Sequence, residues 1–205
     1  QYQITVVIGL ALRDTSTSPS GGSYNVALGI TGSDVVRYDK HHLIPSIEAD
    51  FRPGSRLSSV NGYALTVCKD MDFPTLMRDL GGTGLVLAPA WDFGTDGWLH
   101  SRMAVLRGVE SGFSVARAAR NGALTASDPG GQVRADVTGA GIVTAVADLP
   151  TTPITTPYER WPDSFAWLCI LVLLGGLLLA TRLRGHRSSP RPNHASPPSA
   201  VAEAW

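Results

Sequence analysis

The sequence has 205 residues, of which 43% are hydrophobic and 17% charged, and its formal net charge is zero. This length allows one main globular domain plus an apolar segment, and the balanced charge argues against nucleic acid as a partner. Cys68 lies at a polar turn and Cys169 lies inside an apolar run, so we predict no disulfide between them.

The amino-terminal part predicts a β-hairpin. Residues 4–11 and 25–30 are rich in strand-forming side chains, and residues 13–22 between them are mostly Ser, Thr, Pro and Gly. We therefore expect two strands joined by a long, exposed tip. Because the chain enters the first strand directly from Gln1, we expect it to be a fragment or a processed piece of a longer protein.

An alternation of strands and helices follows, which is typical of an α/β layer structure. The predicted order is strand, helix, strand, helix, strand, at residues 63–67, 74–80, 85–88, 99–111 and 113–118. Three further strands are expected to close the domain, at residues 123–127, 133–137 and 142–146. In such a fold, ligands bind at the carboxyl ends of the strands.

Cys68 lies where the first of these strands meets its helix. The apolar run at residues 63–67 ends at Cys68-Lys69-Asp70, and Pro74 suits the first position of the helix. A strand-to-helix corner exposes its side chain and directs the following amide groups at it, which favours a thiolate. The alternative is a buried structural cysteine.

The carboxyl-terminal part changes in character. Residues 149–163 are rich in Pro and Thr, and we expect a linker. Residues 164–181 are eighteen uncharged residues, seven of them Leu, which span roughly 27 Å as a helix and predict a transmembrane segment. A buried core helix is the alternative.

Basic residues follow the apolar run and predict its orientation. Arg182, Arg184 and Arg187 belong to a basic tail, residues 182–205, that we expect to be disordered and cytoplasmic. The globular domain is therefore expected on the extracytoplasmic side of the membrane.

Several motifs together resemble the nitrilase, or carbon–nitrogen hydrolase, superfamily. Tyr38 to Pro45 fits the pattern Y-x-K-x-H-L-x-P, Phe51 to Gly54 fits F-x-P-G, and Cys68 to Pro74 fits C-x-[ED]-x-x-F-P. The likeness continues through residues 85–92, 107–112 and 128–131. It implies a four-layer α-β-β-α sandwich for residues 1–148, followed by the single carboxyl-terminal transmembrane helix.

The resemblance also implies roles for individual residues. Cys68 would be the nucleophile that carries an acyl group as a thioester, Lys40 would stabilise the oxyanion, and Glu48 would help to hold and polarise the site. Read without the family, Lys40 is a solvated lysine and Glu48 a loop carboxylate. Asp70 occupies a position that the family usually fills with an acid, whereas Lys69 replaces a usual tyrosine and either assists the thiol or points to solvent.

One family residue has no counterpart in the sequence. The glutamate that acts as base precedes the strand with which this chain begins, and the first acidic residue here is Asp14. We therefore expect this segment alone to be catalytically incomplete, with the base on an upstream segment, and a pseudoenzyme remains open.

The domain, the segment Thr156 to Asp163 and the apolar helix together look like the carboxyl-terminal part of bacterial apolipoprotein N-acyltransferases. This likeness implies a phospholipid acyl donor, an apolipoprotein acceptor and a location in the bacterial inner membrane. A membrane-tethered amidase or nitrilase is the alternative, and a catalytically dead binding domain is the third. No cofactor is implied, and the spacing of His41, His42 and His100 predicts no metal site.

Overall fold

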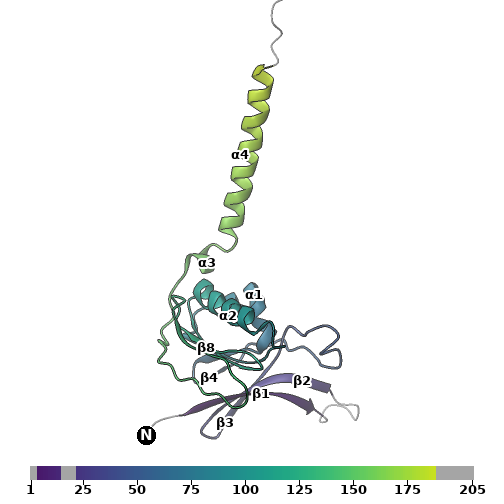
Figure 1. The fold of residues 1–205 in the computed structure, drawn as a ribbon, viewed down its shortest axis with the longest axis vertical. Coiled ribbons are helices and arrows are strands. Elements are labelled where there is room, and N and C mark those ends of the chain that lie inside the picture. Colours follow the sequence, from purple (N-terminus) through teal and green to yellow (C-terminus); the bar gives the residue numbers. More distant parts are fainter. Residues whose placement is uncertain (1–3, 15–21, 188–205) are drawn as a thin grey trace, which may run out of the picture. The chain divides into compact units, whose positions relative to one another are not determined.

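The computed structural model describes residues 4–14 and 22–187 and divides the chain into two units, Gln1–Pro162 and Asp163–Trp205. The first unit contains two β-sheets and two main helices (Figure 1). The second unit contains one long helix. The two units are described in turn.

The first sheet has three antiparallel strands in sequence order. They are β1 (Thr5–Asp14), β2 (Gly22–Thr31) and β3 (Asp34–Asp39). The pairing of β1 with β2 confirms the predicted hairpin, and the greater part of its predicted tip, residues 15–21, lies outside the described residues.

The second sheet has six strands in sequence order, and β5, β6 and β7 are parallel to one another. The strands are β4 (Ser59–Val60), β5 (Tyr63–Leu65), β6 (Leu85–Trp91), β7 (Ser114–Arg120), β8 (Leu124–Ser127) and β9 (Val133–Val137). Between the parallel strands lie the 3-10 turn η1 (Cys68–Asp72), α1 (Pro74–Asp79) and α2 (Gly97–Ser111). The predicted α/β alternation is therefore present.

Each face of the six-stranded sheet carries its own apolar cluster. Val86 and Val115 pack with Met77 under the helices, whereas Leu65 and Val67 pack with the three-stranded sheet. This division follows from the alternation of side chains along a strand, because neighbours such as Val86 and Leu87 point to opposite faces.

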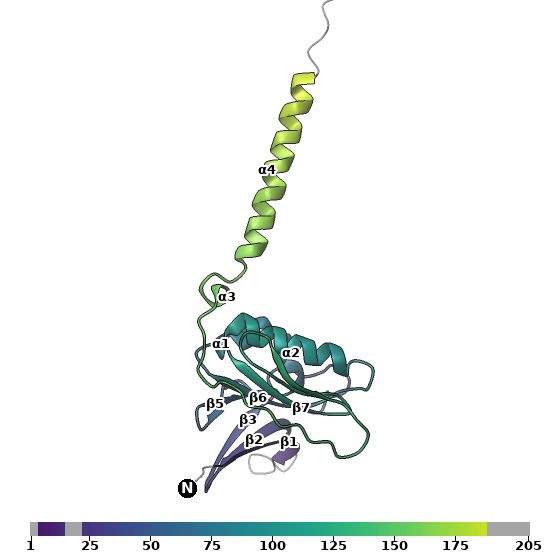
Figure 2. The same cartoon turned by 60° about the vertical axis from the view of Figure 1, so that its left-hand side comes forward.

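Of the four layers predicted for the sandwich, three are present among the described residues. Helices α1 and α2 cover one face of the six-stranded sheet, and the three-stranded sheet lies on the other face (Figure 2). No helix within residues 4–14 and 22–162 covers the outer face of the three-stranded sheet. There, Val6 and Ile8 of β1 are 47% and 44% exposed.

The strand predicted at residues 142–146 is wrong. This segment has no strand pairing in the structure, and Ile142 and Val146 are exposed. The alternation of side chains is nevertheless present. Ala145 and Ala147 are less exposed than Ile142 and Val146, and they line a cavity together with Thr5. The segment is extended, but no neighbouring strand supplies the hydrogen-bond ladder that defines a sheet.

The predicted linker, residues 149–163, is hydrogen-bonded to the rest of the first unit at several points. The Ile154 amide donates to Gly112 O over 2.9 Å, and Thr156 Oγ1 donates to Glu110 O over 2.5 Å. Thr156 also caps the short helix α3 (Pro157–Arg160) by accepting from the Glu159 amide. This part of the segment therefore belongs to the folded unit.

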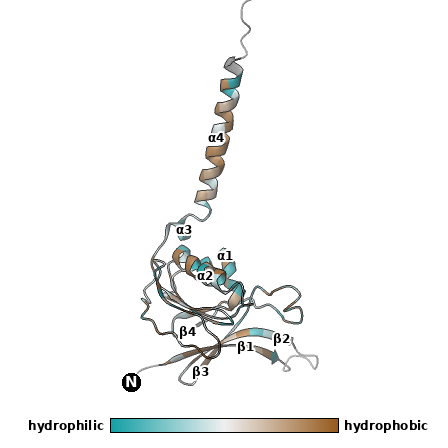
Figure 3. Cartoon of the chain, viewed as in Figure 1, coloured by the Kyte–Doolittle hydropathy of each residue, from teal (hydrophilic) through white to brown (hydrophobic). Residues whose placement is uncertain are grey.

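The second unit contains helix α4 (Ser164–Arg187). Ser164–Arg184 is long and apolar enough to cross a membrane, with a mean hydropathy of 2.3, and Figure 3 shows apolar residues along most of the helix. The predicted disorder from residue 182 onward is wrong for residues 182–187, because good helix formers such as Leu183 and Arg184 continue the helix. Residues 188–205 lie outside the described part of the chain.

Candidate active site

Cys68 stands at a strained corner after strand β5. Its φ is +49°, a left-handed value that costs a non-glycine residue about 1–3 kcal/mol. The thiol is partly exposed and donates a weak hydrogen bond to Trp91 O over 3.6 Å. Strain of this kind gathers at functional sites, and Cys68 is the first residue of the turn η1.

Lys40 and Glu48 form a buried ion pair. Lys40 Nζ lies 2.9 and 2.7 Å from the two Glu48 carboxylate oxygens, and the side chains are 1% and 8% exposed. The Asn25 side-chain amide and the Ile44 backbone amide also donate to this carboxylate, over 2.5 and 2.6 Å. The structure thus places Lys40 away from solvent and contradicts the reading of a solvated surface lysine.

The environment of Glu48 keeps it ionised. Burial acts to raise the pKa of this carboxyl, but the hydrogen bonds from Lys40, Ile44 and Asn25 together hold the pKa below its ordinary value. Glu48 is therefore a fixed negative charge that orients the Lys40 ammonium.

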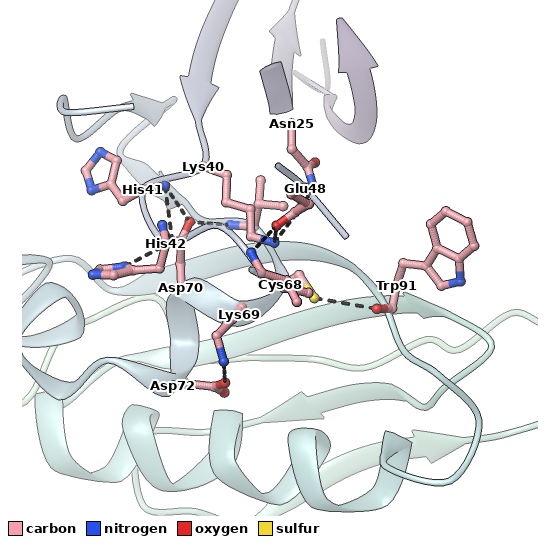
Figure 4. A network of polar contacts seen from close by, with 12 residues as sticks. Asn25, Lys40, His41, His42, Glu48, Cys68, Lys69, Asp70, Asp72 and Trp91 are labelled. Carbon is pink, nitrogen blue, oxygen red and sulfur yellow. Dashed lines mark hydrogen bonds and ion pairs between the residues drawn. The ribbon is translucent and has the colours of Figure 1, made fainter. Parts of the chain in front are cut away.

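Asp70 joins the Lys40 segment to the turn that carries Cys68. Its fully buried carboxylate accepts from the Tyr38 hydroxyl over 2.8 Å and from the Val67 amide over 3.3 Å. It also accepts from the His42 amide over 2.8 Å (Figure 4). Burial and the neighbouring Asp70 raise the pKa of Tyr38, so its hydroxyl stays protonated and donates. Asp70 therefore fixes the position of one segment relative to the other.

The Lys69 side chain pairs with Asp72 and lies apart from the Lys40–Glu48 pair. Its ammonium lies 3.4 Å from Asp72, and its side chain is 34% exposed. Lys69 and Asp72 line a small cavity of about 190 Å³ that also reaches Cys68. Lys69 therefore does not join the Lys40–Glu48 pair.

A larger cavity of about 650 Å³ brings three of the predicted site residues together. Cys68, Lys40 and Glu48 line it, and most of the remaining lining residues are apolar. Apolar cavities of about 300–1,000 Å³ with a few polar groups are typical of small-molecule sites. Figure 4 shows the ion pair and Cys68 in one view.

Sequence reasoning missed several contacts. Asn25, on β2, holds Glu48, and Arg117, within an apolar strand, forms a buried ion pair with Asp92. A charged residue in an apolar run is the signal that could have indicated the Arg117 pair. The contact of His100 Nδ1 with Asp92 Oδ1 over 3.1 Å was not predicted either. Within residues 4–14 and 22–187, no group of three or more His, Cys, Asp or Glu side chains is placed to hold a metal ion.

Solved structures of the nitrilase superfamily share the fold. No protein-family model matches the sequence.

Particular structures similar to this chain include an amidase from Nesterenkonia sp. AN1. One mutant of it, with the acetamide moiety of fluoroacetamide added covalently at the active site cysteine, is 26% identical over 65% of this chain and 57% of that chain, with a TM-score of 0.55. A second mutant, with acrylamide added at the active site cysteine, is 24% identical over 80% of this chain and 68% of that chain, with a TM-score of 0.57.

Nit3 of Saccharomyces cerevisiae, from branch 10 of the nitrilase superfamily, is also similar. It is 20% identical over 63% of this chain and 53% of that chain, with a TM-score of 0.55. The chain thus spans 53–68% of the length of these three structures. The protein has a mixed α/β nitrilase-like fold.

Proposed function

We propose that the protein is a membrane-bound N-acyltransferase. Cys68 takes an acyl chain from a phospholipid as a thioester and passes it to the terminal cysteine amine of an apolipoprotein at the bacterial inner membrane. The observation that carries the proposal is the partly exposed Cys68 in the lining of a mostly apolar cavity that is lined also by the Lys40–Glu48 pair. The apolar helix Ser164–Arg184 supports the membrane location.

The chemistry follows from the charges beside Cys68. When the thiolate attacks an ester carbonyl, negative charge develops on the carbonyl oxygen, and a preorganised ammonium stabilises that charge most where water is excluded. Lys40 meets this requirement because it is buried and oriented by Glu48. The apolar lining gives the donor's hydrocarbon chain a place to leave water.

A hydrolase is the second candidate, and the similarity to an amidase with adducts at its active site cysteine favours it. Both functions share the acyl-enzyme and differ in the acceptor, which is an amine in one and water in the other.

The test supplies the full-length protein, including the upstream segment expected to carry the base, in detergent with phospholipid. A peptide whose terminal cysteine is alkylated is then added, and the products are analysed by mass spectrometry. An acyltransferase gives the N-acyl peptide at the expense of free fatty acid. Release of fatty acid without N-acyl peptide, together with ammonia release from simple amides, would instead establish the hydrolase.

A further inference from the structure

The lining of the 650 Å³ cavity carries one uncompensated positive charge. The charged residues in the lining are Lys40, Glu48 and Arg120. Lys40 and Glu48 pair with each other, so their formal charges cancel and that of Arg120 remains. No carboxylate among the described side chains forms an ion pair with Arg120. The cavity therefore favours a ligand that brings a negative charge.

The Trp91 ring holds the Arg120 guanidinium. Arg120 Cζ lies 4.7 Å from the centre of this ring, a cation–π contact. Trp91 is 53% exposed and Arg120 is exposed as well, so solvent and ligands can reach the contact. The ring restricts the position of the guanidinium without neutralising its charge. The N–H donors of Arg120 are therefore available to an anionic group.

Arg120, Trp91 and Cys68 lie in a row at one edge of the six-stranded sheet. Cys68 follows β5, Trp91 ends β6 and Arg120 ends β7, and these three strands are parallel neighbours. Trp91 pairs in register with Arg120, and its carbonyl oxygen accepts from Cys68 Sγ over 3.6 Å (Figure 4). Neighbouring strands lie ~4.8 Å apart, so about 10 Å separates β5 from β7. A donor whose reacting carbonyl lies at Cys68 can thus place a group a few bonds further on beside Arg120.

We propose that Arg120 binds the phosphodiester of the acyl donor and that Trp91 is a positioning residue that holds the guanidinium. This inference rests on the proposed function, and it names the part of the phospholipid that the site recognises. In a glycerophospholipid, a glycerol unit joins each ester carbonyl to the phosphate. This unit and the arginine side chain together span the interval from Cys68 to β7. The planar guanidinium suits phosphate because it can donate two parallel hydrogen bonds.

The two cations of the cavity have different tasks. Lys40 is buried and lies where charge develops during acyl transfer. Arg120 contacts a group whose charge does not change in the reaction, so its contribution is equal in the bound donor and in the transition state. Loss of Arg120 is therefore expected to weaken donor binding with little effect on the maximal rate.

The experiment compares two donors that carry the same acyl groups and differ in the phosphate-bearing headgroup. Dihexanoyl phosphatidylglycerol or dihexanoylglycerol is supplied in neutral detergent to the full-length protein, including the upstream segment expected to carry the base. Intact-mass analysis follows the acylation of Cys68. Arg120→Gln should raise the half-saturating concentration of the phospholipid by about 10-fold to 100-fold, as for loss of a hydrogen bond to a charged group. The half-saturating concentration of dihexanoylglycerol should not follow it.

Further variants separate charge, geometry and packing. Arg120→Lys keeps the charge but not the fork, so it should raise the half-saturating concentration of the phospholipid less than Arg120→Gln does. Trp91→Phe keeps an aromatic face and should bind the phospholipid better than Trp91→Leu. The matched control is Arg56→Gln, at an exposed position in the loop before β4, and it should behave as the parent protein does.

A third lipid separates the donor's own phosphate from a charged lipid surface. An ether-linked phosphatidylglycerol has no ester to transfer, and the proposal expects it to compete with the phospholipid donor in the parent protein. If it instead raises the acylation rate with dihexanoylglycerol to that with the phospholipid, Arg120 recognises an anionic surface and the proposal is overturned.

The proposal is also overturned if Arg120→Gln shifts neither donor, or shifts both equally. If the parent protein gains no acyl group on Cys68 from either donor, the proposed function itself fails. That outcome is seen before any variant is compared.

Discussion

Lys40 and Glu48 lie in a setting where the loss of one partner is costly. Both side chains are at least nine-tenths buried, so removing one charge leaves the other without compensation in a medium of low dielectric. A single substitution at this site therefore affects both folding and catalysis, and a test of the catalytic role has to separate the two.

Lys40→Met is expected to lower the free energy of unfolding by about 3–5 kcal/mol, because it leaves Glu48 ionised and unpaired. Acylation of the folded fraction should fall by roughly 100-fold to 1,000-fold, as for loss of an oxyanion donor. The double variant Lys40→Met/Glu48→Gln removes both charges and should recover stability without recovering acylation. Urea denaturation and single-turnover kinetics measure the two effects. Near-normal acylation by either variant would end the catalytic assignment of Lys40.

Glu48 makes stability depend on pH in a defined direction. Its pKa in the folded protein is below its ordinary value of 4.5, so its stabilising contribution is complete above that value and is lost as the pH falls through the lower, folded pKa. The stability difference between the parent and Glu48→Gln should therefore be constant near neutral pH and shrink below about pH 4.5. Urea midpoints from pH 7 to pH 3 test this. A difference that stays constant down to pH 3 would contradict the assignment.

Some of the individual site residues could be predicted from the sequence. Cys68, Lys40 and Glu48 were found through the order and spacing of short motifs, and the structure brings all three to one cavity. The contacts of Asn25 with Glu48 and of Arg117 with Asp92 could not be predicted, because each joins residues more than twenty positions apart that only the folded chain brings together.

At the scale of elements, Asp70 connects the segment after β3 with the turn η1. An asparagine at this position keeps the size but turns a donor toward backbone amides that cannot accept. Asp70→Asn should lower the free energy of unfolding by about 1–3 kcal/mol and slow acylation, because the corner that holds Cys68 loosens. The control is Asp34→Asn at the exposed β2–β3 turn, where a change within about 0.5 kcal/mol is expected. Equal stability of the two variants in urea would show that Asp70 does not join these segments.

The elements themselves were predicted where local pattern and tertiary contacts agree. The alternation over residues 63–118 was correct because each parallel strand has a neighbour and each helix covers the sheet. The strand at residues 142–146 was wrong because period-two alternation indicates extended backbone, whereas a strand also needs a hydrogen-bonded partner.

At the scale of the whole molecule, the arginines after the apolar helix predict its orientation. Arg182 and Arg184 lie at the carboxyl-terminal end of the span Ser164–Arg184, whereas Trp167 lies near its other end and Trp161 just before it. Protease added to intact spheroplasts should therefore digest the globular unit and leave the tail protected. Protection of the globular unit until the membrane is lysed would reverse the predicted topology.

The central claim is that Cys68 carries the acyl group. The most direct measurement is intact-mass analysis of the full-length protein after exposure to an acyl donor, with Cys68→Ala and Cys169→Ala as a matched pair of variants. The account predicts one added acyl group on the parent and on Cys169→Ala, its release by neutral hydroxylamine as expected for a thioester, and no adduct on Cys68→Ala. An adduct that survives Cys68→Ala, or one that is lost in Cys169→Ala, would contradict the account.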